Sequence, residues 1–359
     1  MLWFVGTGVN GYLGLSIAAL DVLKKCDIVY VERFTSALSG DDLRGLNSIV
    51  EMDAKLVQRW FVEDGREILE AARTKDVALV TYGDPLIATT HSELRSRAAK
   101  NSIGTAVLHA ASGIGSIIGE AGLHVYKFGR IVTMMSELQS ALSVYNTIFE
   151  NLLAGSHTLV LTEYSHHNNN DESKELFFLD PSSVCKMLLD VEQDQKHKIF
   201  SDDTFVVVAS RVGMQDQKIT SGKVKSLMGR DFGNGPHSVI ITGALHFTES
   251  EALSSLTENI DEPTDNSQHA KRIEAQMVER YAPKAKQAAQ QIRKLINYDT
   301  DGTKGIFEVV DNAEYYIADA ERFLRQVKFE LAVLSIGYAE GLLDALHFQK
   351  RIDPWDAHS

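Results

Sequence analysis

Short apolar runs alternate with helical patterns over about the first 255 residues, which is typical of an α/β fold. Residues 2–5, 27–32 and 77–81 are predicted to be buried strands. Residues 16–25 and 89–100 are predicted to be helices between them. Because ligand crevices in open α/β sheets form beyond the carboxyl ends of strands, we expect a small molecule to bind at the turns that follow them.

The chain divides into parts that differ in composition and in the spacing of apolar residues. The alternation begins again after residue 110, which predicts a second α/β unit. From residue 258 the composition becomes acidic and polar, as in a linker, and the residues beyond it have the spacing of long helices. The predicted organisation is an α/β domain at 1–110, a second α/β domain at 111–257, a linker at 258–268 and a helical domain at 269–359.

In the predicted helical domain, residues 269–297 and 312–348 have the pattern of two long helices. We expect them to form a hairpin, and the α/β part to fold without them. One helix face carries apolar side chains at spacings of four, four and three residues, and we expect it to be buried: Phe323, Val327, Leu331 and Leu334.

Charge and cysteine content narrow the functional classes. The formal net charge is −13, and an acidic surface repels the phosphate backbone of nucleic acids. The chain has two cysteines, Cys26 and Cys185, which is too few for a disulfide framework. We expect them to be reduced thiols in a cytoplasmic protein. The N-terminal residues lack the basic region of a signal peptide, and no apolar run approaches the ~18 residues of a membrane span. We therefore expect a cytoplasmic protein without a membrane or nucleic-acid partner.

A glycine motif follows the first predicted strand. Gly6, Gly8 and Gly11 satisfy the pattern G-x-G-x-x-G, and Glu32 ends the next strand. In a dinucleotide enzyme such glycines admit a pyrophosphate at a helix N-terminus, and the acid binds the ribose. Ser16 indicates that the helix begins beyond the motif, whereas a dinucleotide-binding helix begins inside it. An NAD-dependent oxidoreductase is therefore the alternative interpretation.

A second turn, residues 83–91, follows the strand at 77–81 and reads GDPLIATTH. Gly83 permits close approach of the backbone to a ligand, and Pro85 stiffens the turn. Asp84 then lies at the carboxyl end of the strand, where we expect a functional carboxylate. The structural alternative is that Asp84 only forms the turn or caps a helix.

No metal site is predicted. His166 and His167 are adjacent in a polar loop, and no close residue completes a ligand set. The chain also lacks a G-x-S-x-G elbow, a Walker loop and an H-E-x-x-H motif, which disfavours serine hydrolases, P-loop NTPases and zincins.

Three long segments resemble the diphthine synthase family: residues 83–98 (GDPLIATTHSELRSRA), 109–129 (HAASGIGSIIGEAGLHVYKFG) and 231–253 (DFGNGPHSVIITGALHFTESEAL). With the opening glycine turn, the resemblance extends in order over residues 1–257. It implies a two-domain tetrapyrrole methylase-like fold with S-adenosylmethionine in the cleft between the domains. Residues 335–346 resemble an uncharacterised archaeal helical family of unknown function.

The resemblance also implies an activity. Members successively methylate the amino group of a 3-amino-3-carboxypropyl-histidine on translation elongation factor 2, giving diphthine in diphthamide biosynthesis. The resemblance also implies a homodimer. The cofactor's sulfonium is already a good leaving group, so the protein mainly aligns a neutral amine with the methyl group. Matching motifs place the cofactor contacts at Val9, Asp84, Ile87, Ser112, Gly113, Thr162, Val212 and His237.

Some positions depart from the family pattern. Tyr82 and Thr242 replace prolines, Thr162 and Glu163 replace a leucine–aspartate pair, and residues 133–145 lack an expected proline- and tryptophan-containing stretch. A third interpretation follows, in which the α/β part is a non-catalytic scaffold. Asp84 and Glu163 are the acids at strand ends, and neither is assigned as a catalytic base.

Overall fold

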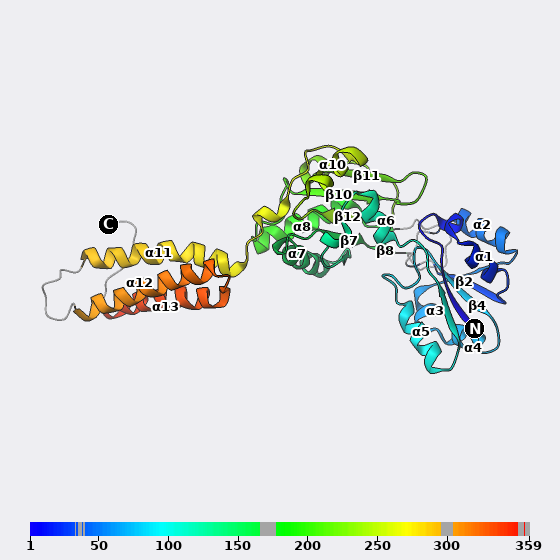
Figure 1. Ribbon diagram of the computed structural model, residues 1–359, viewed down its shortest axis with the longest axis horizontal. Coiled ribbons are helices and arrows are strands. Elements are labelled where there is room, and N and C mark those ends of the chain that lie inside the picture. The colour runs from blue at the N-terminus through cyan, green and yellow to red at the C-terminus, as the bar shows by residue number, and fades with distance from the viewer. Residues whose placement is uncertain are drawn as a thin grey trace. The chain divides into compact units, whose positions relative to one another are not determined.

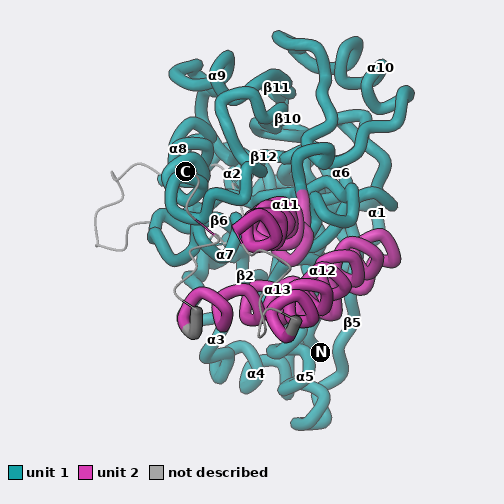
Figure 2. The backbone as a smooth tube through the Cα atoms, turned by 90° about the vertical axis from the view of Figure 1, so that its left-hand side faces the viewer, with its two compact units in different colours: residues 1–270 teal, residues 271–359 magenta. Residues whose placement is uncertain are grey.

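The computed structural model describes the chain except residues 33, 35–37, 39, 166–176, 296–303, 351–354 and 356–359. It divides into two compact units, Met1–Ala270 and Lys271–Ser359. Figure 1 labels many of the elements and colours the chain from its N-terminus to its C-terminus, and Figure 2 colours the two units. The α/β class with a helical C-terminal part is confirmed.

The first sheet is five-stranded and parallel, in the order β3-β2-β4-β1-β5. Because both faces of β4 are covered, its side chains divide between two cores: Leu79 packs into one, and Ala78 and Val80 into the other. The strands are β1 (Leu2–Gly6), β2 (Ile28–Glu32), β3 (Lys55–Val57), β4 (Val77–Thr81) and β5 (Thr105–Leu108). The helices are η1 (Gly11–Gly14), α1 (Ile17–Leu23), α2 (Gly40–Val50), α3 (Arg59–Asp64), α4 (Arg66–Ala72) and α5 (His91–Lys100).

The second sheet is six-stranded and mixed, in the order β13-β11-β10-β12-β7-β6. Its strands are β6 (Val132–Met134), β7 (Thr158–Thr162), β10 (Phe205–Ser210), β11 (Lys218–Lys223), β12 (His237–Ile241) and β13 (Glu258–Asn259). The helices are α6 (Gly113–Glu120), η2 (Val125–Lys127), α7 (Leu138–Leu153), α8 (Pro181–Gln195), α9 (Val224–Leu227) and α10 (Phe247–Leu256). A small hairpin joins β8 (Tyr164–Ser165) to β9 (Phe177–Phe178).

The stretch 258–268, which composition predicts as a linker, packs on the second sheet instead. Strand β13 pairs with β11, and η3 (Asn266–His269) follows. The Asn266 side chain is buried and donates to the carbonyl oxygens of Phe205 and Thr242 at 2.8 and 2.9 Å. Its polar side chain bonds backbone groups at the start of β10 and just after β12, so the polar composition here reflects internal hydrogen bonding rather than exposure to solvent.

The second unit contains α11 (Ile273–Leu295), α12 (Lys304–Arg325) and α13 (Phe329–Lys350). The predicted single helix at 312–348 was wrong, because the chain reverses at Val327, whose φ is 60°. The expected burial of the apolar face was also wrong: Val327, Leu331 and Leu334 are 69%, 44% and 57% exposed. The core between these helices is rich in alanine, which allows close packing.

One stretch of α13, Phe329–Phe348, has the length and mean hydropathy (1.3) of a membrane span among the described residues. Glu340 and Asp344 interrupt this stretch, so it is not the continuous apolar run whose absence was predicted. The likeness to a membrane span concerns length and composition alone. One side of the helix packs against α11 and α12 through Ala332, Ile336 and Ala339, so core packing accounts for part of its apolar character.

Candidate functional site

A cavity of about 320 Å³ is lined by residues from both sheets of the first unit. This volume lies at the lower end of the range for small-molecule sites. The loop after β4 and the start of α6 supply one wall, and the end of β7 and the start of β12 supply another. Of the predicted cofactor contacts, the following line it: Asp84, Ile87, Ser112, Gly113, Thr162 and His237.

Asp84 is held rigidly at the carboxyl end of β4. It is 6% exposed, and its Oδ2 lies 2.7 Å from Nδ1 of His109. Its Oδ1 accepts a hydrogen bond from the backbone amide of Leu86 at 2.9 Å. Gly83 precedes it with a φ of 72° and exchanges backbone hydrogen bonds with Gly8. Asp84 therefore does form the turn, as the structural alternative predicts, and it also faces the cavity.

Thr162 and His237 meet because β7 and β12 are antiparallel, so the end of one lies beside the start of the other. The Thr162 hydroxyl donates to the carbonyl oxygen of His237 at 2.7 Å. The His237 Nδ1 lies 2.9 Å from the Ser210 hydroxyl. Burial lowers the pKa of His237, so its ring is neutral near pH 7 and offers a neutral hydrogen-bonding group to the cavity.

Val9 and Val212 do not line this cavity. They line a separate open hollow of about 500 Å³ together with Asn10 and Gly213. The Tyr82 hydroxyl links them: it donates to the carbonyl oxygen of Val9 at 2.7 Å and lies 3.4 Å from that of Val212. Burial, and the charge of nearby Asp42, raise the pKa of Tyr82 to about 12, so the hydroxyl keeps its proton.

Sequence reasoning missed several residues that line the cavity, among them Tyr82, Phe34 and Arg59. Tyr82 was noted only as a departure from the family pattern, and Phe34 and Arg59 were not considered. Arg59 opens α3, and its guanidinium carbon lies 5.3 Å from the centre of the Phe34 ring. No motif contains Arg59, because it opens α3, which is distant in sequence from residues 83–91.

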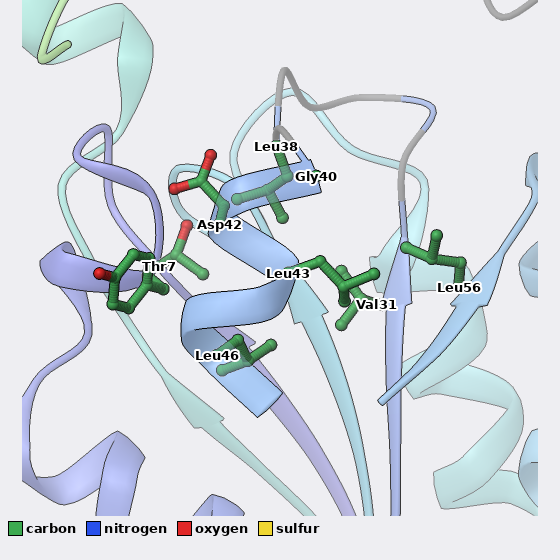
Figure 3. A pocket seen from close by; sticks show the side chains of 9 residues that line it. Thr7, Val31, Leu38, Gly40, Asp42, Leu43, Leu46 and Leu56 are labelled. Atoms are coloured by element: carbon green, nitrogen blue, oxygen red, sulfur yellow. The ribbon is translucent and has the colours of Figure 1, made fainter. Parts of the chain in front are cut away.

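A smaller apolar hollow lies beneath α2 (Figure 3). Its volume of about 20 Å³ holds little more than a water molecule. Leu43 and Leu46 of α2 and Val31 of β2 line it, with Thr7 and Asp42 as polar residues. It is therefore a packing feature of the first sheet rather than a ligand site.

The glycine motif does not form a dinucleotide site of the expected kind. Helix α1 begins at Ile17, with the Ser16 hydroxyl as its cap, beyond the last glycine of the motif. Glu32 is fully buried, and its carboxylate accepts a hydrogen bond from the Phe34 amide at 3.1 Å. A buried acid committed to the backbone is poorly placed to bind a ribose, so the oxidoreductase alternative is not favoured.

Within the described part of the chain, no group of three or more His, Cys, Asp or Glu side chains is arranged to hold a metal ion. His166 and His167 lie outside the described residues.

Two family models match the chain. The model described as tetrapyrrole (corrin/porphyrin) methylases matches residues 1–228, and one described as a protein of unknown function (DUF357) matches residues 280–352. The first match spans more than half of the chain, which therefore belongs to the tetrapyrrole methylase family and is a methyltransferase.

Its relatives define the branch more narrowly. The chain is 35% identical over 255 residues to the diphthine synthase of Methanothermobacter thermautotrophicus, covering 70% of this chain and 94% of that protein. It is 35% identical over 263 residues to that of Methanocaldococcus jannaschii, covering 72% and 100%. Within its family, the α/β unit belongs with the diphthine synthases.

Solved structures agree with this placement. An Entamoeba histolytica protein, solved as a candidate diphthine synthase, superposes with a TM-score of 0.63 at 31% identity, covering 73% of this chain and 99% of that one. Another diphthine synthase superposes with a TM-score of 0.61 at 26% identity, covering 72% and 96%. These structures cover 72–73% of this chain, so the helical second unit is not part of the fold that they share with it.

Proposed function

We propose that this methyltransferase binds S-adenosylmethionine in the 320 Å³ cavity and methylates elongation factor 2. The acceptor is the amino group of the 3-amino-3-carboxypropyl-histidine, and successive transfers give diphthine. One observation carries the proposal: six of the eight cofactor positions inferred from separate motifs, drawn from both halves of the chain, line one cavity. The proposed cofactor contacts are Val9, Asp84, Ile87, Ser112, Gly113, Thr162, Val212 and His237, of which Val9 and Val212 line the separate hollow.

The cavity's residues suit the cofactor in chemical terms. The rigid Asp84 carboxylate offers acceptors for hydroxyl groups or for a positive charge, and Ile87 offers an apolar surface. Ser112 and Gly113 lie at the start of α6, where backbone amides lack helical partners. The bound cofactor supplies an activated methyl group, and the protein's residues orient it and exclude water.

The acceptor amine must be neutral when it attacks. An apolar cavity favours the neutral form of an amine, because burial penalises its charge. Glu163 lies on the cavity wall and Asp84 is committed to turn hydrogen bonds, so we assign positioning roles to both and no catalytic base.

We further propose that the enzyme acts in the cytoplasm as a homodimer, with the α/β halves at 1–110 and 111–257 forming the cofactor site. These proposals rest on the family resemblance. The chain's excess of acidic residues, with a net charge of −13, is compatible with a protein substrate and gives no support to nucleic-acid binding.

A reconstituted reaction tests the proposed function. Purified protein is incubated with S-adenosylmethionine and with elongation factor 2 that carries the 3-amino-3-carboxypropyl group. We expect the factor to gain mass in methyl increments, and unmodified factor to gain none. Calorimetry should show binding of S-adenosylhomocysteine and not of NAD. Cofactor binding without methyl transfer would support the scaffold interpretation instead.

A further inference from the structure

We propose that Arg59 and Glu163 together bind an amino-acid headgroup, that is, an amine and a carboxylate on the same carbon atom. Both residues line the 320 Å³ cavity, and they come from different α/β halves of the first unit: Arg59 opens α3, and Glu163 follows β7. This inference rests on the proposed function, since it assigns the part of the cavity that recognises the headgroup.

Arg59 is available to bind an anion. Its guanidinium lies over the face of the buried Phe34 ring, which orients the planar group without satisfying its donors. Among the residues that the structure describes, no carboxylate forms an ion pair with it. A guanidinium in this state is suited to a carboxylate, which it can bind through two parallel hydrogen bonds.

One carboxylate oxygen of Glu163 is held by hydrogen bonds, and the other can accept one from a ligand. Its Oε2 accepts hydrogen bonds from the backbone amide and the hydroxyl of Ser136, and its own amide donates to Met134. Its Oε1 has no hydrogen-bond partner within the described part of the chain. Ser136 therefore holds the carboxylate in place while leaving one oxygen to receive an ammonium or amine proton.

A guanidinium and a carboxylate on different walls of one cavity favour a ligand that carries a carboxylate for Arg59 and an amine for Glu163. Two sources offer this headgroup: the methionine part of the cofactor, and the 3-amino-3-carboxypropyl side chain of the modified histidine. The simpler alternative is that Arg59 only packs on Phe34 and that Glu163 only caps the Ser136 turn. Binding measurements distinguish these cases.

The experiment compares Arg59→Met and Glu163→Gln with two surface controls. Arg66→Met removes a guanidinium that is 88% exposed, and Glu137→Gln removes an exposed carboxylate beside Ser136. Affinities for S-adenosylhomocysteine and for 5′-methylthioadenosine, which lacks the headgroup, are measured by calorimetry. The KM for modified elongation factor 2 and kcat are measured by methyl transfer.

If the cofactor supplies the headgroup, each site variant weakens S-adenosylhomocysteine binding about tenfold and leaves methylthioadenosine binding unchanged. If the modified histidine supplies it, each variant raises KM about tenfold with S-adenosylhomocysteine affinity unchanged. Either result supports the proposal, provided that the controls behave as wild type.

Wild-type values for S-adenosylhomocysteine affinity and KM in both site variants would overturn the inference. Equal losses for both nucleosides would also overturn it, because they would indicate a general structural effect. If the wild-type enzyme transfers no methyl group, the proposed function fails, and the comparison of the two nucleosides alone decides the headgroup assignment.

Discussion

The phenolic hydroxyl of Tyr82 donates a hydrogen bond to the backbone carbonyl of Val9, with 2.7 Å between the two oxygens. This contact joins the loop after β4 to the turn after β1. Both segments contribute proposed cofactor contacts. A carbonyl oxygen has two lone pairs, so Val9 can accept from Tyr82 and from a ligand at the same time.

We expect Tyr82→Phe to weaken S-adenosylhomocysteine binding about fivefold, since the turn at Val9 loses one neutral hydrogen bond worth about 1 kcal/mol. Calorimetry measures the change. Tyr126→Phe is the matched control, because Tyr126 is 92% exposed. Equal affinities for wild type and Tyr82→Phe would show that this contact does not position the cofactor.

Asp84→Ala should reduce S-adenosylhomocysteine affinity at least tenfold, because it removes a cavity carboxylate and the acceptor for the Leu86 amide. Circular dichroism checks that the fold is retained. Asp21→Ala, an exposed residue of α1, serves as the control and should bind normally. Unchanged affinity in Asp84→Ala would contradict the proposed site.

A buried ion pair stabilises the second sheet. Glu249 is fully buried, and it accepts hydrogen bonds from Lys127 at 2.5 Å and from the backbone amides of His124 and His246, each at 2.8 Å. It also accepts from Nε2 of His157 at 3.1 Å. We expect Glu249→Gln to lower the free energy of unfolding by about 3 kcal/mol, because the charge of Lys127 loses its partner.

Urea unfolding of Glu249→Gln measures this loss, with Glu251→Gln on the exposed side of α10 as control. The control should change the free energy of unfolding by less than about 0.5 kcal/mol. A loss of the same size in both variants would mean that the buried pair adds nothing specific.

The same carboxylate predicts a pH dependence. Burial alone would raise the pKa of Glu249, but the hydrogen bonds from Lys127 and from the amides of His246 and His124 lower it from 4.5 to about 2. A lowered acid pKa stabilises the fold above pH 4.5, and that contribution is lost as the pH falls towards 2. The stability difference between wild type and Glu249→Gln should therefore shrink between pH 7 and pH 3. A constant difference over this range would argue against the lowered pKa.

Truncation tests the boundary of the first unit. A chain that ends at Ala270 should unfold cooperatively, because it retains the compact unit. A chain that ends at Ile260 should be markedly less stable, because it lacks Asn266 and its hydrogen bonds to Phe205 and Thr242. Thermal unfolding compares the two. Asn266→Ala in the longer chain should reproduce part of the loss, and equal stability of both truncated chains would place the boundary earlier.

Much of the first unit could be predicted from the sequence because its signals are local. Strands that are buried on both faces, such as β4, are continuous apolar runs, and Gly83 marks a turn that needs a positive φ. The motif around Asp84 identified one wall of the cavity for the same reason. The second unit was less predictable, since alanine-rich helices have the same pattern whether a chain continues straight or reverses at Val327.

The sequence by itself determined the alternation of strands and helices, the glycine turns and the identity of the family, because each depends on residues close together along the chain. Only the tertiary structure decided that Arg59 and Glu163 face one cavity, that Tyr82 joins Val9 to the loop after β4, and that Asn266 completes the second sheet. These relationships join segments far apart in sequence, and side-chain packing and backbone hydrogen bonding, which composition does not record, bring them together.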